Sequence, residues 1–310
     1  MDFGSPSRKA QQRVVKIYGA GGVKGLEAYQ SGFLVSPEGH IATVWSTVLD
    51  VPPIVLLDDG RRFESELIHF EPVLQIAVLK IDATNLPFFE MPSSRTVSVG
   101  DAVLAVSNLF NIATGSEPAS VMRGAIAAVT RLDARRGTYS TPYRGDVFVL
   151  DLVANNPGAA GGALVNPSGG LVGMLGRELR DANTGVWLNY AVPADVLRQT
   201  VGDIIAGKLT TRPADDPLLS REQSHASEKL GLVLVPDVLE STPNFVDAVT
   251  ADSAASKAGL RPDDLILLVN GVRVTGQASF RTELRKINRR DDLNLVVQRG
   301  SEIVSVVLRP

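Results

Sequence analysis

Residues 156–166 read Asn-Pro-Gly-Ala-Ala-Gly-Gly-Ala-Leu-Val-Asn, and this stretch decides how the rest of the chain is interpreted. Its proline and glycines favour a tight turn, and the apolar run that follows is typical of a buried strand. The glycines would let the backbone N–H groups of Gly158 and Ala160 point toward one place. Residual binding of a carbonyl or carboxylate oxygen is one interpretation of this loop. The other, which we favour, is that the glycines serve only the turn.

Short apolar runs and turn signals alternate on both sides of this loop, from Val14 to about Leu175. The runs include 32–35, 54–57, 76–79, 102–106 and 147–150, and the turns between them include 37–39, 58–60 and 167–170. Many short strands with frequent turns are typical of an all-β barrel or sandwich. A helix is predicted after Pro193, where apolar residues recur roughly at helical spacing.

A polar stretch at 210–227, with two prolines and several Asp and Ser residues, indicates a linker. The residues after it predict strands at 232–235 and 265–269, a helix near 279–287 and a closing hairpin of 293–297 with 303–308. We therefore expect three segments, namely a first domain at 10–209, a linker at 210–228 and a second domain at 229–310.

The composition excludes several classes of protein. With 310 residues, 44% hydrophobic and 21% charged, the chain has apolar material for two globular cores. A net charge of −3 argues against nucleic acid as a partner, and no run of 18 apolar residues predicts a membrane span. The absence of cysteine excludes disulfides, thiolate catalysis and cysteine-based zinc sites, and we expect no metal and no cofactor.

Five segments, in this order, resemble the HtrA family of trypsin-type serine proteases that carry a C-terminal PDZ domain. They are 30–41, 73–81, 99–108, 156–166 and 191–193. The resemblance covers nearly the whole chain. It implies a mainly β protein, in which a chymotrypsin-like pair of six-stranded β-barrels is followed by a small α+β PDZ domain.

The catalytic positions that the resemblance identifies are all substituted. Where the family reads Asn-Pro-Gly-Asn-Ser-Gly-Gly, the nucleophile position is Ala160 and the residue before it is Ala159. The general-base position is Ser46 and the aspartate position is Gln75. Alanine has no atom that can attack a carbonyl, and serine cannot act as a base near neutral pH. The resemblance therefore implies a pseudoprotease with no catalytic residue.

No other side chain is expected to replace the missing base. The chain has three histidines, His40, His69 and His225, in a turn, ahead of the Gln75 strand and in the linker. We interpret all three as surface or turn residues. A residual or unconventional serine-type endopeptidase acting in protein quality control remains the alternative function.

The second domain keeps the features of a peptide-binding module. Lys229-Leu230-Gly231-Leu232 resembles the PDZ loop whose backbone N–H groups hold a terminal carboxylate, and the following strand would pair with a ligand strand until Pro236. The stretch 254–266, followed by Asn270-Gly271, is the most specific PDZ-like segment, with Asp263 or Asp264 where the family usually has Gly. The apolar helical stripe Phe280, Leu284 and Ile287 either lines the peptide groove or packs on the core.

Two functions other than hydrolysis are consistent with this sequence. One is a module that binds peptides or protein C-termini through the PDZ domain. The other is a scaffold that forms a homotrimer, or a hetero-oligomer with active paralogues, through a segment around Val14–Tyr18. The resemblance implies a periplasmic or secreted protein. The first twelve residues lack the apolar core of a signal peptide, so a cytoplasmic location stays open unless a signal has been removed.

Overall fold

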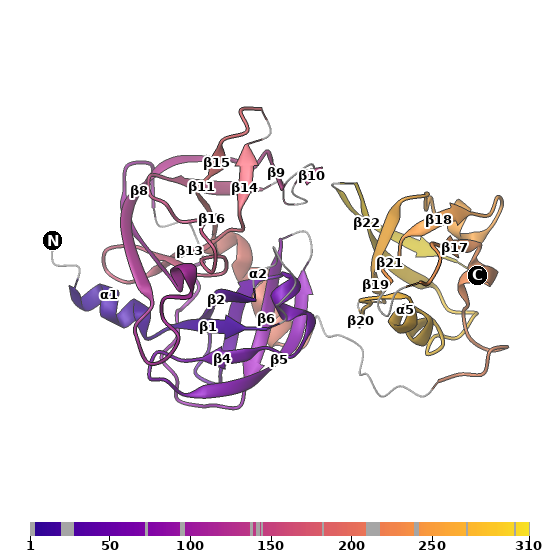
Figure 1. Cartoon of the computed structure of the whole chain (residues 1–310), viewed down its shortest axis with the longest axis horizontal. Helices are drawn as coiled ribbons and strands as arrows, with labels where there is room; N and C mark the ends of the chain where they lie inside the picture. The colour runs from indigo at the N-terminus through magenta and orange to yellow at the C-terminus, as the bar shows by residue number, and fades with distance from the viewer. Residues whose placement is uncertain are drawn as a thin grey trace. The chain divides into compact units, whose positions relative to one another are not determined.

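The computed structural model describes residues 4–19, 28–71, 74–93, 97–136, 139–140, 143, 145–181, 183–208, 218–238, 242–270, 272–300 and 302–309. The chain divides into two compact units, 1–209 and 210–310, named here the barrel unit and the C-terminal unit (Figure 1). The predicted boundaries at 10–209, 210–228 and 229–310 stay predictions. Residues 210–217 of the expected linker lie outside the described residues.

The first half of the barrel unit is a closed barrel in the order β1-β2-β3-β6-β5-β4. Its strands are β1 Val14–Tyr18, β2 Tyr29–Leu34, β3 His40–Val44, β4 Ile54–Leu56, β5 Arg62–Glu71 and β6 Ile76–Ile81. The 3₁₀ turn η1, Thr47–Asp50, follows β3. Apolar side chains of these strands, such as Phe33, Val44 and Val78, are buried, which is why the short apolar runs form strands here.

The second half is another closed barrel, in the order β11-β16-β13-β12-β7-β8. Its strands are β7 Ala102–Ser107, β8 Ser120–Arg131, β11 Asp146–Leu150, β12 Ala163–Val165, β13 Leu171–Leu175 and β16 Tyr190–Pro193. The 3₁₀ turn η2, Leu109–Asn111, follows β7. A separate four-stranded sheet contains β9 Ala134–Arg136, β10 Tyr139–Ser140, β14 Leu179–Asp181 and β15 Trp187–Leu188. The predicted pair of six-stranded antiparallel barrels is confirmed.

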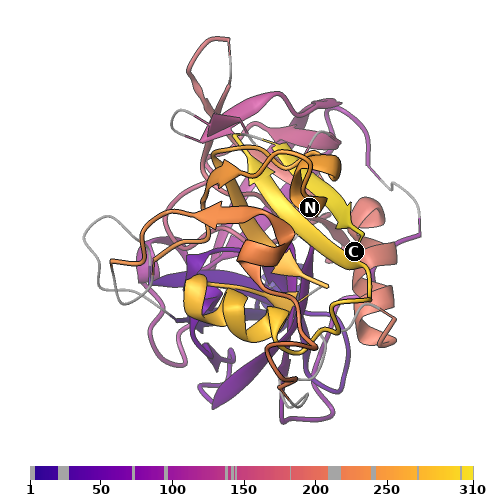
Figure 2. The same cartoon turned by 90° about the vertical axis from the view of Figure 1, so that its right-hand side faces the viewer.

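Two helices pack on the barrels. The predicted helix after Pro193 is α2, Ala194–Ile205, which buries Leu197, Val201 and Ile204 and is seen from its side in Figure 2. No apolar pattern predicts α1, Gly4–Gln11, because its residues are mostly polar. Long-range contacts hold it instead, including an ion pair between Arg8 and Asp58 at 2.7 Å.

The C-terminal unit combines two small antiparallel sheets with short helices. Its elements are α3 Ser227–Leu230, β17 Leu232–Leu234, β18 Val246–Val249, α4 Ala254–Lys257, β19 Asp264–Val269, β20 Val272–Arg273, α5 Gln277–Leu284, β21 Leu293–Arg299 and β22 Glu302–Leu308. One sheet pairs β17 with β18, and the other runs β20-β19-β21-β22. The small α+β architecture is the one expected. Among the described residues of the whole chain, no helix has the length and apolarity that crossing a membrane requires.

Candidate functional site

The loop that resembles a nucleophile loop lies between β11 and β12, and two of its glycines are required by geometry. Gly158 and Gly161 both have φ of +83°, in the left-handed region that favours glycine. A Cβ atom at Gly158 would lie 2.3 Å from the carbonyl oxygen of Asn108, and one at Gly161 would lie 2.3 Å from that of Ser31. The tight turn alone therefore accounts for both glycines.

The same turn leaves a pair of hydrogen-bond donors available. The carbonyl of Pro157 accepts a hydrogen bond from the N–H of Phe110 at 2.8 Å, and the carbonyl of Ala159 accepts one at 2.9 Å from within the loop. In a planar trans peptide the N–H points opposite to the C=O, so the N–H groups of Gly158 and Ala160 point away from these bonds. Neither donates to an acceptor among the described residues. This pair could receive a carbonyl or carboxylate oxygen.

Ser46, at the general-base position, forms hydrogen bonds with residues of the first barrel. Its Oγ donates to Oε1 of Gln30 at 2.5 Å and accepts from the N–H of Val48 at 3.1 Å, so that it caps η1. Gln75 precedes β6 with a φ of 55°, and its carbonyl accepts from the N–H of Trp45 at 2.9 Å. No hydrogen bond joins the side chains of Ser46 and Gln75 in the described part of the chain.

A buried chain of neutral polar groups connects Ser46 with the loop of Gly158 and Ala160. Gln30 Nε2 donates to Thr43 Oγ1 at 2.7 Å, and this hydroxyl donates to the carbonyl of Ser31 at 2.6 Å. Ser31 then reaches the loop, since its Oγ donates to the carbonyl of Gly158 at 2.7 Å and its N–H donates to that of Ala160 at 3.0 Å. Gln30, Thr43 and Ser31 are at most 1% exposed. We call these three residues the cleft network.

Further hydrogen bonds link the segments around Trp45 and the end of β13, and no sequence pattern predicted them. Arg177, which follows β13, donates from Nη1 to the carbonyl of Trp45 at 3.2 Å. Asn155 Nδ2 donates to the carbonyls of Gly176 and Arg177 at 2.9 and 3.1 Å. The Trp45 ring stacks on Phe70 at 4.6 Å, with 20° between the ring planes.

The interpretation of the three histidines as surface or turn residues is wrong for His69 and His225, which are 9% and 4% exposed. His40 Nδ1 lies 2.7 Å from Ser36 Oγ, and His225 Nε2 lies 2.9 Å from the carbonyl of Asp291. His69 is buried on β5, and desolvation lowers the pKa of its imidazole below the usual value. Burial, with the charge of Lys80, also lowers the pKa of His40. Among the described residues, no group of three or more His, Asp or Glu side chains could hold a metal ion.

In the C-terminal unit, β17 lies at the edge of its two-stranded sheet and borders a cavity of about 420 Å³. We call this cavity the groove. Residues 231–237 form one of its sides, and Gln277 and Arg281 of α5 also line it. An unpaired strand edge beside a helix can accept a further strand.

The loop before β17 differs in detail from an open carboxylate-binding turn. The N–H of Leu230 donates to the carbonyl of Ala226 at 3.1 Å, and the N–H of Gly231 donates to that of Glu228 at 3.2 Å. Both amides therefore complete the end of α3. Gly231 has a φ of +79°, and a Cβ atom there would lie 2.2 Å from the Cβ of Ser253.

The predicted helix near 279–287 is α5, which ends at Leu284, and the apolar stripe assigned to it belongs mainly to the core. Phe280, Leu284 and Ile287 are 0%, 1% and 4% exposed and pack in one hydrophobic cluster with Leu230 and Leu232. None of the three lines the groove, although Leu284 lines a neighbouring pocket. A helix on a small core turns its apolar face inward, so its polar residues, here Gln277 and Arg281, face the groove.

Polar contacts cross the groove at the end of β17. Gln277 Nε2 donates to the carbonyl of Val235 at 2.6 Å. Arg281 forms an ion pair with Asp237 at 2.9 Å and also donates to Oε1 of Gln277 at 2.8 Å. The i, i+4 spacing of Gln277 and Arg281 is the sequence signal that could have identified them.

Comparisons with known proteins agree with this architecture. Residues 30–174 match the trypsin-like peptidase domain family, and residues 245–299 match the PDZ domain family. A probable periplasmic serine endoprotease, DegP-like, of Chlamydia pneumoniae is 28% identical over 285 residues, which are 89% of this chain and 53% of the relative. A protein of the same description from Pseudomonas savastanoi pv. phaseolicola is 30% identical over 247 residues, which are 78% of this chain and 47% of the relative. The chain spans about half the length of these curated relatives.

Solved structures show the same fold. The serine endoprotease of Yersinia pestis is 24% identical with a TM-score of 0.54, covering 100% of this chain and 97% of that one. The HtrA-type protease AlgW with tripeptide is also 24% identical with a TM-score of 0.54, covering 100% of this chain and 96% of that one. The chain therefore carries the trypsin-like peptidase domain and the C-terminal PDZ domain of the HtrA/DegP family.

Proposed function

We propose that this protein is a pseudoprotease, which binds polypeptides without hydrolysing them. The observation that carries the proposal is Ala160, because the position that would supply the nucleophile has a methyl side chain. Ser46 and Gln75 stand where the base and its orienting carboxylate are expected, and Ser46 already bonds to Gln30. Loss of a working triad costs about a million-fold in turnover, and the oxyanion donors and binding alone leave a rate roughly a thousand-fold above that in water.

The C-terminal unit would supply the binding function. A peptide would add to the open edge of β17 by main-chain hydrogen bonds, and the paired segment would be short because Pro236 has no N–H to donate. Peptides or protein C-termini are the ligands we propose. A homotrimer, or a hetero-oligomer with active paralogues, would present several such grooves. We place the protein in the periplasm or outside the cell, because its relatives are named periplasmic.

Hydrolysis is tested with a quenched fluorescent casein. The wild type should release no more dye than a blank, and a serine-reactive fluorophosphonate should not label it. Ala160→Ser alone should also stay inactive because a base is missing. The combined variant Ser46→His, Gln75→Asp, Ala159→Asn and Ala160→Ser serves as the positive control. The open donor pair of Gly158 and Ala160 favours one second candidate, a residual endopeptidase. Wild-type cleavage that survives purification from a protease-deficient host would establish that candidate and refute ours.

Peptide binding is tested by fluorescence anisotropy with pools of labelled peptides. The backbone of Gly231 and Val235 hydrogen-bonds to the β18 side, so by alternation the N–H of Leu234 faces the open edge; Leu234→Pro removes it while Leu234→Thr keeps it. We expect the proline variant to lose binding and the threonine variant to retain it. A bulky residue at Gly231 is a poorer test, because its Cβ would collide with Ser253 and disturb the fold. Equal binding by both Leu234 variants would exclude β17 as the docking strand.

A further inference from the structure

The four-stranded sheet of the barrel unit has one buried face and one open face. Ala134 of β9 and Leu179 of β14 are 0% and 2% exposed and belong to the main hydrophobic cluster. Arg135 and Arg180, which follow them in the sequence, are exposed. Because side chains alternate along a strand, both arginines lie on the face that points away from the core. The turn between β14 and β15 extends away from the two barrels in Figure 1 and in Figure 2.

An exposed tryptophan lies beside these arginines. The strand register places Arg180 directly opposite Trp187 of β15 on one side and opposite Arg135 of β9 on the other, so the three form one row across the sheet. The guanidinium carbon of Arg180 lies 4.4 Å from the centre of the Trp187 ring. Trp187 is 53% exposed, and Val186, which precedes it at the turn, is 64% exposed. We call Arg135, Arg180, Val186 and Trp187 the hairpin patch.

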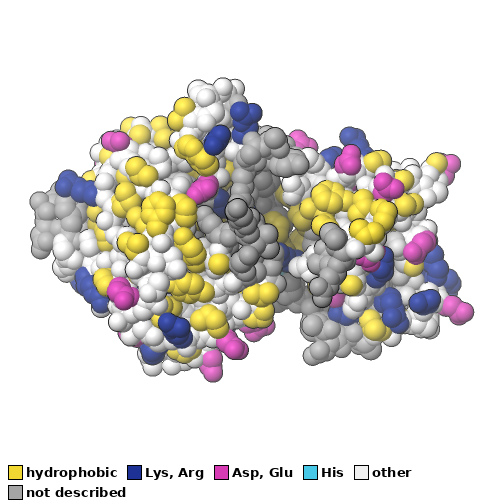
Figure 3. Space-filling model, viewed as in Figure 1, with side chains coloured by type: hydrophobic (Ala, Val, Ile, Leu, Met, Phe, Trp, Pro, Cys, Tyr) yellow, Lys and Arg dark blue, Asp and Glu magenta, His cyan; other side chains and the backbone are white. Residues whose placement is uncertain are grey.

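The two arginines of the hairpin patch have no acidic side chain bound to them. Neither Arg135 nor Arg180 forms an ion pair with a residue that the structure describes. Asp181 follows Arg180, but its Oδ1 accepts hydrogen bonds of 2.6 to 3.0 Å from the turn itself. Residues 131–136 and 177–188 carry five arginines and three acids, whereas the whole chain has a net charge of −3. In Figure 3, dark blue and yellow side chains lie on the visible face where Figure 1 labels β14 and β15.

We propose that the hairpin patch binds the surface of an anionic phospholipid bilayer. Trp187 would lie at the level of the headgroups, where an aromatic ring with one polar edge is favoured, and Val186 would reach the start of the acyl chains. Arg135 and Arg180 would contact lipid phosphates, and each should raise the affinity about fivefold. The contact is peripheral and reversible, and it is independent of the peptide binding proposed above.

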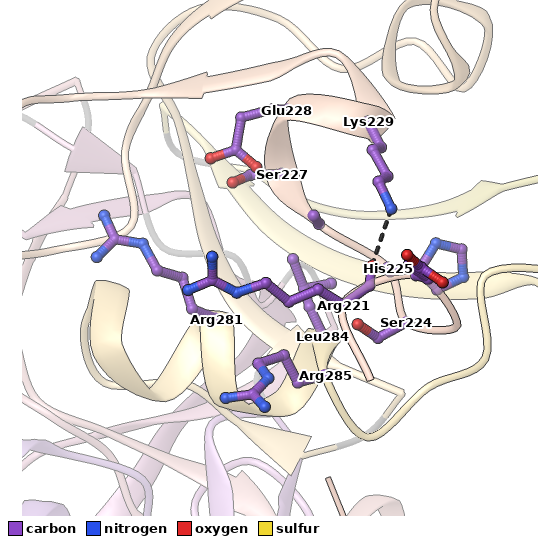
Figure 4. Close-up of a pocket in the computed structure, with 11 residues that line it drawn as sticks. Arg221, Ser224, His225, Ser227, Glu228, Lys229, Arg281, Leu284 and Arg285 are labelled. Atoms are coloured by element: carbon purple, nitrogen blue, oxygen red, sulfur yellow. Dashed lines mark hydrogen bonds between the residues drawn. The ribbon is translucent and has the colours of Figure 1, made fainter. Parts of the chain in front are cut away.

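A second group of arginines, in the C-terminal unit, shows what distinguishes the hairpin patch. Arg221, Arg281 and Arg285 line a cavity of about 570 Å³ (Figure 4). The large apolar side chain that lines it with them, Leu284, is only 1% exposed, so this cavity offers charge without an exposed apolar group. An aromatic ring beside cations could also stack on the bases of a single-stranded nucleic acid, but the aliphatic Val186 would add nothing to stacking. Exposed apolar side chains next to unpaired arginines therefore favour a bilayer.

Binding is tested by co-sedimentation of the whole chain with lipid vesicles. Vesicles of phosphatidylglycerol with phosphatidylcholine should bind the protein, and vesicles of phosphatidylcholine alone should bind it much less. Added salt should weaken the binding because it screens the arginines. Tryptophan emission should shift to shorter wavelength as Trp187 leaves water. Trp187→Phe, in which Trp45 is the remaining tryptophan, should still bind but show no such shift.

Matched variants assign the binding to the hairpin patch. Arg180→Gln should weaken it about fivefold, whereas Arg285→Gln, an equal charge change in the cavity of the C-terminal unit, should change little. Arg135→Gln should match Arg180→Gln, which would exclude lost stacking on the tryptophan ring as the cause. Trp187→Ala should weaken binding about tenfold, and Phe245→Ala, on an aromatic residue 39% exposed in the other unit, should not. Thermal melting checks that each variant is folded.

Three results would overturn this inference and leave the peptide-binding proposal intact, since peptide anisotropy is a separate measurement. The hairpin patch binds no bilayer if neither kind of vesicle binds, or if Arg285→Gln weakens binding as much as Arg180→Gln. It is a contact between copies of this chain if Trp187→Ala lowers the mass found by light scattering and leaves vesicle binding unchanged. It binds nucleic acid if a labelled single-stranded oligonucleotide binds and the vesicles do not.

Discussion

The cleft network of the barrel unit and the groove of the C-terminal unit differ in the burial and charge of their polar groups. In the cleft, Gln30, Thr43 and Ser31 are neutral, almost fully buried and bonded to one another and to the backbone. In the groove, the exposed side chain of Arg281 is charged and forms an ion pair with the exposed Asp237. The polar groups of the cleft network are bonded within the protein, whereas the charged groups of the groove can exchange their partner for a ligand.

The difference follows from the cost of burying polar groups. A buried donor or acceptor that loses its partner costs about 1–3 kcal/mol, so a fully bonded buried network resists change. An exposed ion pair contributes about 0–1 kcal/mol and is readily exchanged. We therefore expect the cleft network to stabilise the barrel unit, and the C-terminal unit to bind the ligand. The predictions below test that division.

The largest effect is expected at the loop of the cleft. Gly161→Ala places a Cβ 2.3 Å from a carbonyl oxygen at positive φ, and should destabilise the barrel unit by about 3 kcal/mol. Both tryptophans, Trp45 and Trp187, lie in the barrel unit, so their fluorescence during urea denaturation reports on it. Gly185→Ala is the control, since Gly185 has a φ of +72° and no atom near the added Cβ. Equal losses in both variants would mean that close packing of the loop contributes nothing.

The cleft network itself should be the next most sensitive part. Thr43→Val leaves Gln30 Nε2 without one acceptor and the Ser31 carbonyl without a donor, at a cost of about 2 kcal/mol. Thr282→Val, which removes a hydroxyl from exposed α5, should leave the tryptophan-detected transition unchanged. If Thr43→Val is as stable as the wild type, the network has no structural role and the contrast between cleft and groove fails.

A smaller, pH-dependent effect is expected from buried His69. Desolvation lowers the pKa of His69 in the folded barrel, whereas in the unfolded chain it titrates near 6.5. The unfolded state then binds more protons below that pH, so the free energy of unfolding is fully present above about 6.5 and decreases as the pH falls. Urea denaturation at pH 7.5 and 5.5 measures this. His69→Gln should reduce the difference and His225→Gln, in the other unit, should not; the reverse result would contradict this assignment.

The sequence predicted the architecture well because short apolar runs separated by turn residues are typical of strands. The runs at 32–35, 76–79 and 102–106 correspond to β2, β6 and β7, since each side chain of a barrel strand either packs inward or faces a neighbour. Helix α1 was missed because it is stabilised by distant partners, such as Asp58, rather than by an apolar stripe. Local pattern carries no information about such contacts.

The site was predicted only as far as residue identity allows. Ala160, Ser46 and Gln75 could be placed by position in a motif, but the cleft network joins β2, β3 and the loop through contacts between distant residues. In the C-terminal unit, the helical stripe was identified, while its polar members Gln277 and Arg281, which line the groove, were passed over. Which face of a helix borders a cavity depends on what packs against it, and this is a tertiary property.

The smallest expected effect concerns a departure from the family pattern in the C-terminal unit. Asp263 has a φ of 66°, a conformation that glycine adopts without steric strain. The adjacent Asp264 is fully buried and forms an ion pair with Arg299 at 2.7 Å. Asp263→Gly should therefore stabilise this unit by about 0.5 kcal/mol. The unit has neither tryptophan nor tyrosine, so amide hydrogen exchange in β19 and β21 is the measurement. A loss of protection would mean that the Asp263 side chain, and not the turn geometry, is what this position requires, and the C-terminal unit would then depend on fixed polar contacts as the cleft does.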